Sequence, residues 1–254
     1  KIHPDQCTET ALFEQAIGLA TREDGRGAPL ARVGFGSGYA GWSLVEPFRE
    51  NLERFEPILP VALHEPAERL PHLRLHNGTI WRWNRPLVGF DADGRVHLRI
   101  EHRPLSAAPS LADAMANLAF AVGLIAALAV QPDPPELQLP FDDARDNFYR
   151  AARDGLDAAL RWPGRGATTT ARDLALALLP AAADGLAWLG VPPADRASWL
   201  GLVEDRVASG RTGAAWQLDA LDASGGDTAR MTLAYAARQA AGEPVHRWSR
   251  PARR

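Results

Sequence analysis

Two strand-like runs joined by a short turn constrain the fold of this chain more than any other feature. Ile80 to Pro86 and Val96 to Arg103 flank Asp91-Ala92-Asp93-Gly94, and an Asp-Gly pair between two such runs is a strong signal for a β-hairpin. Side chains alternate between the faces of a strand, so the second run places on one face His97, Arg99, Glu101 and Arg103. The opposite face is mostly apolar, with Val96, Leu98, Ile100 and His102.

The ionic row on this strand is the main candidate site. Two arginines flanking a carboxylate are costly to place on a half-buried sheet unless a charged ligand or ionic partners accompany them. An internal salt-bridge ladder, which also occurs on exposed sheets, explains Arg99, Glu101 and Arg103 equally well from the pattern alone. The strand therefore predicts either a binding site for an anion or a metal, or a structural ladder.

The composition excludes several classes of function. Hydrophobic content of 46% and charged content of 23% are typical of a soluble globular protein. The net charge of -3 argues against a general nucleic-acid binder, which usually carries a concentrated positive field. Lys1 is the single lysine, which argues against Schiff-base chemistry and against a phosphate-loop lysine. One cysteine, Cys7, excludes an internal disulfide framework and a Cys-based zinc site.

The longest apolar run indicates a core helix. Leu118 to Val130 is about 13 residues long, whereas a membrane span needs about 20, so we expect a buried helix and no contact with a membrane. The start of the chain carries no charged-then-apolar signal. Together with the lone Cys7, these features favour a cytoplasmic protein. The chain also opens at Lys1 without a methionine, which suggests a piece of a longer protein.

Periodicity and capping residues predict that most of the chain is helical. Ser110 is expected to cap a long helix that runs to Val130, and from Phe141 onward every segment reads as helical. The residue ranges expected to be helical are 8–20, 43–55, 110–130, 141–160, 170–190, 193–209, 214–221 and 228–241. Residues 30–35 read as a short strand, 57–71 as an irregular segment, 72–76 as strand-like and 242–254 as a loose tail.

Three further patterns have a functional and a plain interpretation. The glycine-rich Gly34 to Gly38 could cradle an oxyanion, but a turn is favoured because the dinucleotide and phosphate-loop spacings are missing. His72 and His76 stand four apart, without the carboxylate motif of a helical zinc site. An acidic group is better explained as the start of a helix, where carboxylates favour the dipole; it comprises Asp142, Asp143 and Asp146.

Tryptophans and arginines alternate just before the turn. Trp81 and Trp83 alternate with Arg82 and are followed by Arg85, a pattern that could stack an aromatic base or a guanidinium. Tryptophans in a strand more often pack against a sheet face.

The most specific pattern is a long motif that covers the first strand and continues into the second. Leu75 to Pro86 reads Leu-His-Asn-Gly-Thr-Ile-Trp-Arg-Trp-Asn-Arg-Pro, and His97 to Arg103 reads His-Leu-Arg-Ile-Glu-His-Arg. This motif resembles the second glutamate–cysteine ligase family of bacteria, the carboxylate-amine ligases. The likeness continues through Asn147-Phe148-Tyr149, Ala151-Ala152-Arg153, Gly155-Leu156-Asp157-Ala158, Glu204, Arg206, Val207, Ser209-Gly210-Arg211-Thr212-Gly213-Ala214 and Trp216-Gln217.

The second strand is also similar, more distantly, to glutamine synthetase, in which the matching glutamate binds a catalytic divalent metal. The resemblance implies that Glu101 is a metal ligand and that Arg103 contacts the transferring phosphate, with Arg99 beside them as a catalytic residue. It implies, less directly, that Arg82 and Arg85 contact the nucleotide or a substrate.

The resemblance implies an ATP- and magnesium-dependent ligase of glutathione biosynthesis that joins glutamate to cysteine or another amine through an acyl phosphate. The implied fold is α+β: part of an antiparallel glutamine-synthetase-like catalytic sheet in residues 1–130, followed by a helical region in residues 131–254 that packs on it. A homo-oligomer is possible, and nucleic acid is not expected as a partner.

The chain departs from the family in ways that bear on the site. His102 stands where the family is expected to have asparagine, and Ser106-Ala107-Ala108-Pro109 replaces a more usual proline- and glycine-containing loop. The family also carries a strand of paired glutamates in its N-terminal half, and this sequence contains no Glu-x-Glu. The resemblance therefore implies the C-terminal half of a ligase. The alternative is a non-catalytic module that binds a small anion or takes part in assembly.

Overall fold

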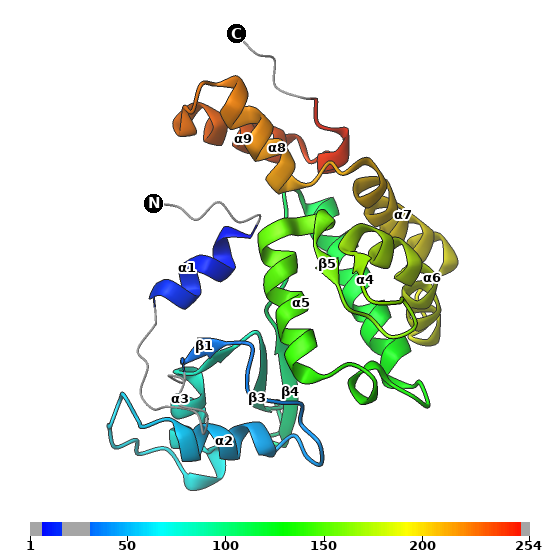
Figure 1. The fold of residues 1–254 in the computed structure, drawn as a ribbon. Coiled ribbons are helices and arrows are strands. Elements are labelled where there is room, and N and C mark those ends of the chain that lie inside the picture. Colours follow the sequence, from blue (N-terminus) through cyan, green and yellow to red (C-terminus); the bar gives the residue numbers. More distant parts are fainter. Residues whose placement is uncertain (1–6, 17–30, 250–254) are drawn as a thin grey trace. The chain divides into compact units, whose positions relative to one another are not determined.

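The computed structural model describes residues 7–16 and 31–249, and the chain divides into two compact units (Figure 1). One unit is Glu9–Ser106 and the other joins Lys1–Thr8 to Ala107–Arg254. This division lies at residues 106/107, whereas the sequence suggested a boundary at 130/131, which stays a prediction. The described residues form a mixed α+β fold that is mostly helical, with small sheets of two strands each.

The smaller unit holds two of these sheets. Its helices are α2 (Glu46–Arg54) and α3 (Pro71–Gly78), and α1 (Thr8–Ala16) leads into it. Its strands are β1 (Val33–Gly34), β2 (Trp81–Arg82), β3 (Asn84–Phe90) and β4 (Val96–His102). β1 pairs with β2 in parallel, and β3 pairs with β4 antiparallel. The described part of this unit therefore has no large catalytic sheet.

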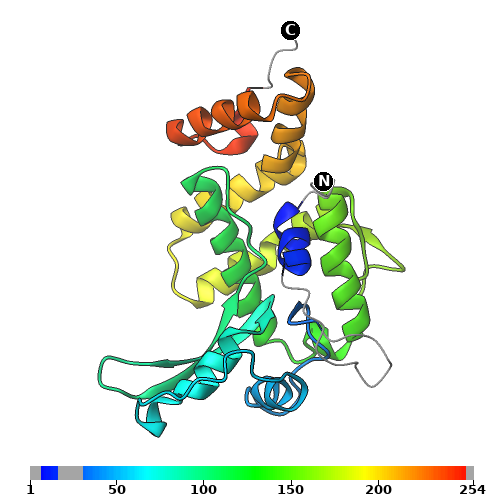
Figure 2. The same ribbon diagram turned by 90° about the vertical axis from the view of Figure 1, so that its left-hand side faces the viewer.

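The predicted hairpin is confirmed as β3 and β4 (Figure 2). At the turn the Asp91 amide donates to the Arg95 carbonyl at 2.9 Å, and Gly94 has a φ of 83°, a conformation that glycine adopts without a steric penalty. The mostly apolar face of β4 is exposed rather than packed. Its exposed fractions are 55% for Val96, 43% for Leu98 and 49% for Ile100.

The run Ile80 to Pro86, predicted as one strand, forms parts of two sheets. Trp81 and Arg82 pair with β1, and β3 begins after Trp83. Beneath this junction the guanidinium carbons of Arg32 and Arg82 lie 5.4 and 5.2 Å from the ring centroid of Phe55. Both arginines and this phenylalanine are buried, and burial lowers the pKa of Arg32. Stacking cations on an aromatic ring offsets part of their desolvation.

Residues 72–76 are helical in α3, so their prediction as strand-like was wrong. Pro71 occupies the first turn, where its missing N–H costs no hydrogen bond. The buried Asn77 fixes the helix: its amide nitrogen donates to the Pro86 carbonyl at 2.8 Å, and its oxygen accepts from the Asn51 side chain at 2.9 Å. Two side-chain hydrogen bonds thus join α3 to α2 and to β3.

The larger unit is mainly a helical assembly. Its helices are α4 (Leu111–Ala129), α5 (Phe141–Asp154), α6 (Ala171–Trp188), α7 (Pro193–Ser209), α8 (Gly213–Ala223) and α9 (Thr228–Ala241). Two short strands, β5 (Ala159–Leu160) and β6 (Thr169–Thr170), pair antiparallel. α4 packs against both α6 and α7, and α8 lies beside α9 (Figures 1 and 2).

Two of the predicted helix starts are confirmed by their caps. The Asp113 amide donates to the Ser110 hydroxyl at 3.1 Å, and the Asp173 amide to the Thr170 hydroxyl at 3.0 Å. The predicted apolar stripe from Phe141 to Leu160 is α-helical only as far as Asp154; a 3-10 turn over Gly155–Asp157 then leads into β5.

The expectation of a buried helix at residues 118–130 was partly wrong. α4 has one face against α6, where Gly123 and Gly185 let the two backbones approach closely, and an opposite exposed face that includes Leu118, Val122 and Ile125. Among the described helices, α4 is the one whose length and composition would allow it to cross a membrane, and 17% of its most apolar window is buried. Length and composition do not separate a span from a helix of a soluble bundle.

The segment after Gly242 is anchored, so its prediction as a loose tail was wrong as far as Ser249. Trp248 is fully buried against Trp216 and Tyr235. The Val245 amide donates to the Asp113 carboxylate at 2.9 Å. Residues 250–254 lie outside the described part of the chain.

Candidate functional site

The centre of the ionic row is a three-residue cluster: Arg85 on β3, Glu101 opposite it on β4, and Arg103 just beyond β4. Arg85 Nε donates to Glu101 Oε2 at 2.8 Å, and Arg85 Nη2 forms an ion pair with the same oxygen, also at 2.8 Å. Arg103 Nη1 donates to this oxygen at 3.2 Å. Both arginines are mostly buried, whereas the Glu101 side chain is 36% exposed. Glu101 Oε2 thus accepts hydrogen bonds from both arginines, and Oε1 has no protein partner among the described residues.

The electrostatics keep this carboxylate ionised. Desolvation raises the pKa of Glu101, but hydrogen bonds and charge attraction from Arg103 and Arg85 outweigh it and leave the pKa below the ordinary glutamate value. An ionised carboxylate with an open oxygen can accept a hydrogen bond or ligate a cation.

Aromatic rings position the far end of the cluster. The Arg103 guanidinium carbon lies 4.9 Å from the Trp81 ring centroid, and the Trp81 ring lies 5.2 Å from that of Phe13. Trp83 is buried, and its indole nitrogen lies 3.3 Å from a Glu14 oxygen. The tryptophans therefore pack beside the hairpin, as expected of strand tryptophans, and Trp81 also stacks a guanidinium of this chain.

Arg82 lies apart from the cluster. It is buried against Phe55, its Nη1 lies 3.4 Å from the Ala31 carbonyl and its Nη2 lies 3.8 Å from Glu50 Oε1. The structure thus brings together Arg85, Glu101 and Arg103 and turns Arg82 toward the interior. A nucleotide contact by Arg82 or Arg85 stays a prediction.

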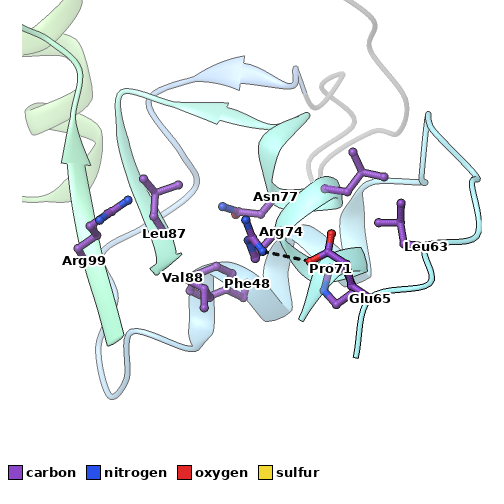
Figure 3. Close-up of a pocket in the computed structure, with 10 residues that line it drawn as sticks. Phe48, Leu63, Glu65, Pro71, Arg74, Asn77, Leu87, Val88 and Arg99 are labelled. Carbon is purple, nitrogen blue, oxygen red and sulfur yellow. Dashed lines mark ion pairs between the residues drawn. The ribbon is translucent and has the colours of Figure 1, made fainter. Parts of the chain in front are cut away.

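Arg99 is two residues from Glu101, on the same face of β4, and lines a cavity of about 390 Å³ between the hairpin, α2 and α3 (Figure 3). The structure records no ion pair for Arg99 with any described residue. Across the cavity Arg74 Nη1 lies 3.8 Å from Glu65 Oε2, and these two side chains point toward one another in Figure 3. Phe48, Leu87 and Val88 supply apolar surface. The charges are two arginines against one glutamate, so the cavity suits an anion.

Sequence reasoning missed Arg74 and Glu65. Arg74 was overlooked because residues 72–76 were taken as strand-like. Pro71 in the first helical turn was the available signal for the helix, whereas Leu73 and Leu75, two residues apart, follow the period of a strand. Glu65 lies in an irregular proline-containing segment, and no sequence pattern connects it to the hairpin.

The local fold accounts for two other sequence candidates, the glycine-rich segment and the acidic group. Gly34 ends β1, and bends and irregular chain follow it as far as Gly38. Gly36 has a φ of 112°, a conformation that glycine adopts without a steric penalty. The acidic group starts α5 as expected: Arg145 pairs with Asp142 at 2.9 Å and with Asp146 at 3.3 Å, and Arg161 pairs with Asp143.

No metal centre is assembled within the described ranges, where three or more His, Cys, Asp or Glu side chains never gather closely enough to hold an ion. His72 Nε2 accepts from the Leu63 amide at 3.2 Å, and His76 Nε2 lies 3.0 Å from the Asn51 carbonyl. One ring nitrogen of each of these histidines is thereby engaged within the protein.

Comparison with models of known protein families, with curated proteins and with solved structures finds no match for this chain.

Proposed function

We propose that this chain supplies one side of the active site of an ATP- and magnesium-dependent carboxylate-amine ligase, of the glutamate–cysteine type. The observation that carries the proposal is the Arg85, Glu101 and Arg103 cluster, with its open carboxylate oxygen beside two fixed cations. The resemblance of the hairpin motif to the carboxylate-amine ligases supports the same assignment, including a share in a glutamine-synthetase-like sheet.

Among the described residues of the cluster, Glu101 fits a role as the one protein ligand of a magnesium ion. Magnesium is usually held by one or two carboxylates together with waters and substrate phosphates, and Glu101 offers one such oxygen. When bound, the ion would neutralise charge on the phosphates of ATP. The positive charges of Arg85 and Arg103 repel a metal cation. Binding of magnesium would therefore need further carboxylates, from outside the described residues.

The arginines have a direct electrostatic role in this reaction. The γ-phosphoryl group passes from ATP to the side-chain carboxylate of glutamate, and the amine of cysteine then displaces phosphate from the acyl phosphate. Negative charge spreads over the phosphoryl oxygens during the transfer, and fixed cations stabilise it. Arg103, held by Trp81 and Glu101, loses little rotamer freedom on binding phosphate and is the proposed clamp. Arg99 is the proposed contact for a substrate carboxylate.

The test uses the intact gene product that contains this chain. Phosphate release that depends on glutamate, cysteine and magnesium should fall at least about tenfold in Glu101→Gln and Arg103→Gln, since each removes a charged contact. Glu136→Gln, an exposed glutamate in the other unit, is the matched control and should leave the rate unchanged. Full activity with unchanged magnesium dependence in Glu101→Gln would exclude this role.

The alternative is a non-catalytic module that binds a small anion, and the unpaired Arg99 in its cavity favours it. Calorimetry separates the two. A ligase site should bind magnesium-ATP with an affinity that Glu101→Gln weakens. A simple anion site should bind inorganic phosphate without magnesium, with an affinity that depends on Arg99 and not on Glu101.

A further inference from the structure

The outer edge of β4 is open, whereas the outer edge of β3 is blocked at Pro86. β4 pairs with β3 and with no other strand among the described residues. On β3, Pro86 has no N–H group to offer a further strand, and its carbonyl accepts from the buried Asn77 side chain at 2.8 Å. β4 contains no proline or lysine, the residues with which proteins commonly block an exposed edge.

The pairing within the hairpin determines which backbone groups of β4 face outward. The Arg103 amide donates to the Trp83 carbonyl and the Asp91 amide to the Arg95 carbonyl, both at 2.9 Å. Bonded pairs alternate along an antiparallel ladder, so the odd-numbered residues of β4 bond to β3 and the even-numbered ones face away from it. The outward-facing residues are Val96, Leu98, Ile100 and His102. Within the described ranges their outward N–H and C=O groups have no hydrogen-bond partner.

The same residues form the exposed apolar face of β4. The side chains of Val96, Leu98 and Ile100 are all exposed. A strand added to this edge gains backbone hydrogen bonds, and its own apolar side chains cover these three, which is favourable.

The charges of β4 restrict how a second copy of the strand can pair with it. Two copies of one strand pair antiparallel about a two-fold axis, and the residue on the axis opposes itself. With Arg99 on the axis, two arginines stand directly opposite each other. With His97 on the axis, Arg95 of each copy opposes Arg99 of the other. Like charges directly opposite are destabilising, which disfavours both registers.

Leu98 on the axis gives a self-complementary register. Leu98 then opposes itself, and Val96 of each copy opposes Ile100 of the other. On the opposite face Arg95 opposes Glu101, a pair of opposite charges. The outward backbone groups also meet as bonded pairs. Apolar contact, backbone hydrogen bonding and charge therefore agree in one register.

A register with Ile100 on the axis matches less well. It also brings opposite charges together, but it puts Leu98 opposite His102. It leaves Val96 opposite Pro104, which has no N–H group for the ladder. The register about Leu98 keeps every apolar residue of the face opposite another.

We propose that two copies of this chain associate through the outer edges of their β4 strands, antiparallel and with Leu98 on the two-fold axis. The occupant of the edge is a second copy because the strand is complementary to itself when reversed. An interface of one strand pair is small, so we expect a dissociation constant between about 1 µM and 1 mM. The proposal does not rest on the ligase function, since it concerns the edge of a strand and not the binding of ATP.

Association and its location are measured on the same chain. Sedimentation equilibrium of the 254-residue chain should show a monomer and a dimer in exchange. Hydrogen exchange of the ¹⁵N-labelled chain, followed by NMR, should alternate along β4. The amides of Val96, Leu98 and Ile100 should gain protection as the concentration rises. Those of His97 and Arg99 should be protected at every concentration, because β3 accepts from them in the monomer as well.

A pair of substitutions tests the register. Val96→Lys and Ile100→Glu each put a charge opposite an apolar residue of the second copy, so each should weaken the dimer at least about tenfold. The double variant opposes lysine to glutamate twice when Leu98 is on the axis, so it should associate at least about threefold more tightly than either single variant. The matched control is Leu233→Lys, at a 73% exposed position on α9, which should leave the dissociation constant unchanged. Because all three positions are exposed, the variants should fold as the parent does, which circular dichroism checks.

A chain that stays monomeric up to about 1 mM would overturn the proposal. So would protection of the Val96 and Leu98 amides that is independent of concentration, because another segment of the same polypeptide would then cover the edge. A dimer that Val96→Lys does not weaken would place the interface elsewhere. A double variant no tighter than the single ones would exclude the register about Leu98. None of these substitutions alters Glu101 or an arginine, so the test of the ligase function stays separate.

Discussion

Two carboxylates paired with arginines, one in each unit, have contrasting surroundings. Asp113 at the start of α4 is fully buried; Arg206 on α7 donates to one oxygen at 2.9 Å, and Ser110 and Val245 donate to the other at 2.7 and 2.9 Å. Glu101 takes both of its arginines on one oxygen and is 36% exposed. The first carboxylate has donors on both oxygens, whereas the second has an oxygen available to a ligand.

The contrast is between a carboxylate whose hydrogen bonds the protein supplies on both oxygens and one that keeps an oxygen without a partner among the described residues. A buried charge is retained only when its neighbours supply the hydrogen bonds that water would give, and Asp113 joins three parts of the larger unit in this way. Two arginines hold Glu101 in one geometry, and its side chain stays partly exposed, as the proposed role requires.

Asp113→Asn should destabilise the protein by about 3–5 kcal/mol, because it leaves Arg206 buried without a charged partner. The asparagine amide would also point its N–H group at hydrogen-bond donors, either Arg206 or Ser110 and Val245. Urea unfolding followed by circular dichroism measures the change. Asp157→Asn, at an 89% exposed side chain that lies 3.8 Å from Arg172, is the matched control and should stay within about 0.5 kcal/mol of the parent. Equal effects of the two substitutions would contradict the structural assignment of Asp113.

Glu101→Gln should cost no more than about 1 kcal/mol of stability, since a partly exposed ion pair is screened by solvent. The same urea titration measures it, and the loss should shrink further in 1 M salt, where the Debye length is about 3 Å. A loss as large as that of Asp113→Asn would show that Glu101 is structural.

The stability contributed by Glu101 should depend on pH in a defined direction. Its pKa is lowered in the folded chain, so its contribution is present above the unfolded value of about 4.3 and is lost as the pH falls through the lower folded pKa. The difference in unfolding free energy between the parent and Glu101→Gln should therefore diminish between pH 5 and pH 3 (about one unit either side of the unfolded value). A difference that grows on acidification would contradict this sign.

Arg99→Ala should leave stability within about 0.5 kcal/mol of the parent, because this exposed arginine has no ion partner among the described residues and surface changes away from such features are small. Arg99→Ala should instead weaken the binding of an anion, so thermal stabilisation by inorganic phosphate should be lost in this variant. The control is Arg95→Ala, which replaces a hairpin arginine that pairs with Asp93 and should keep the stabilisation. Identical phosphate responses of the two variants would exclude Arg99 as an anion contact.

Much of the local structure follows from short-range signals. The hairpin turn at Asp93-Gly94, the caps at Ser110 and Thr170 and the end of α7 at Gly210 each depend on residues within about four positions of one another. α3 was mistaken because it is short and rich in residues without a strong helical period, and its stability depends on Asn77 bonding to Asn51 and Pro86.

The sequence by itself determined which residues share a face of β4 and where most helices begin and end, because strand alternation and capping are local properties of the backbone. The tertiary structure decided which charges meet. Arg206 reaches Asp113 across 93 positions, Arg85 rather than Arg99 pairs with Glu101, and Arg99 is left facing a cavity. Pairing depends on the relative positions of whole elements, which hydrophobic packing and hairpin register set together, and no short stretch of residues contains that information.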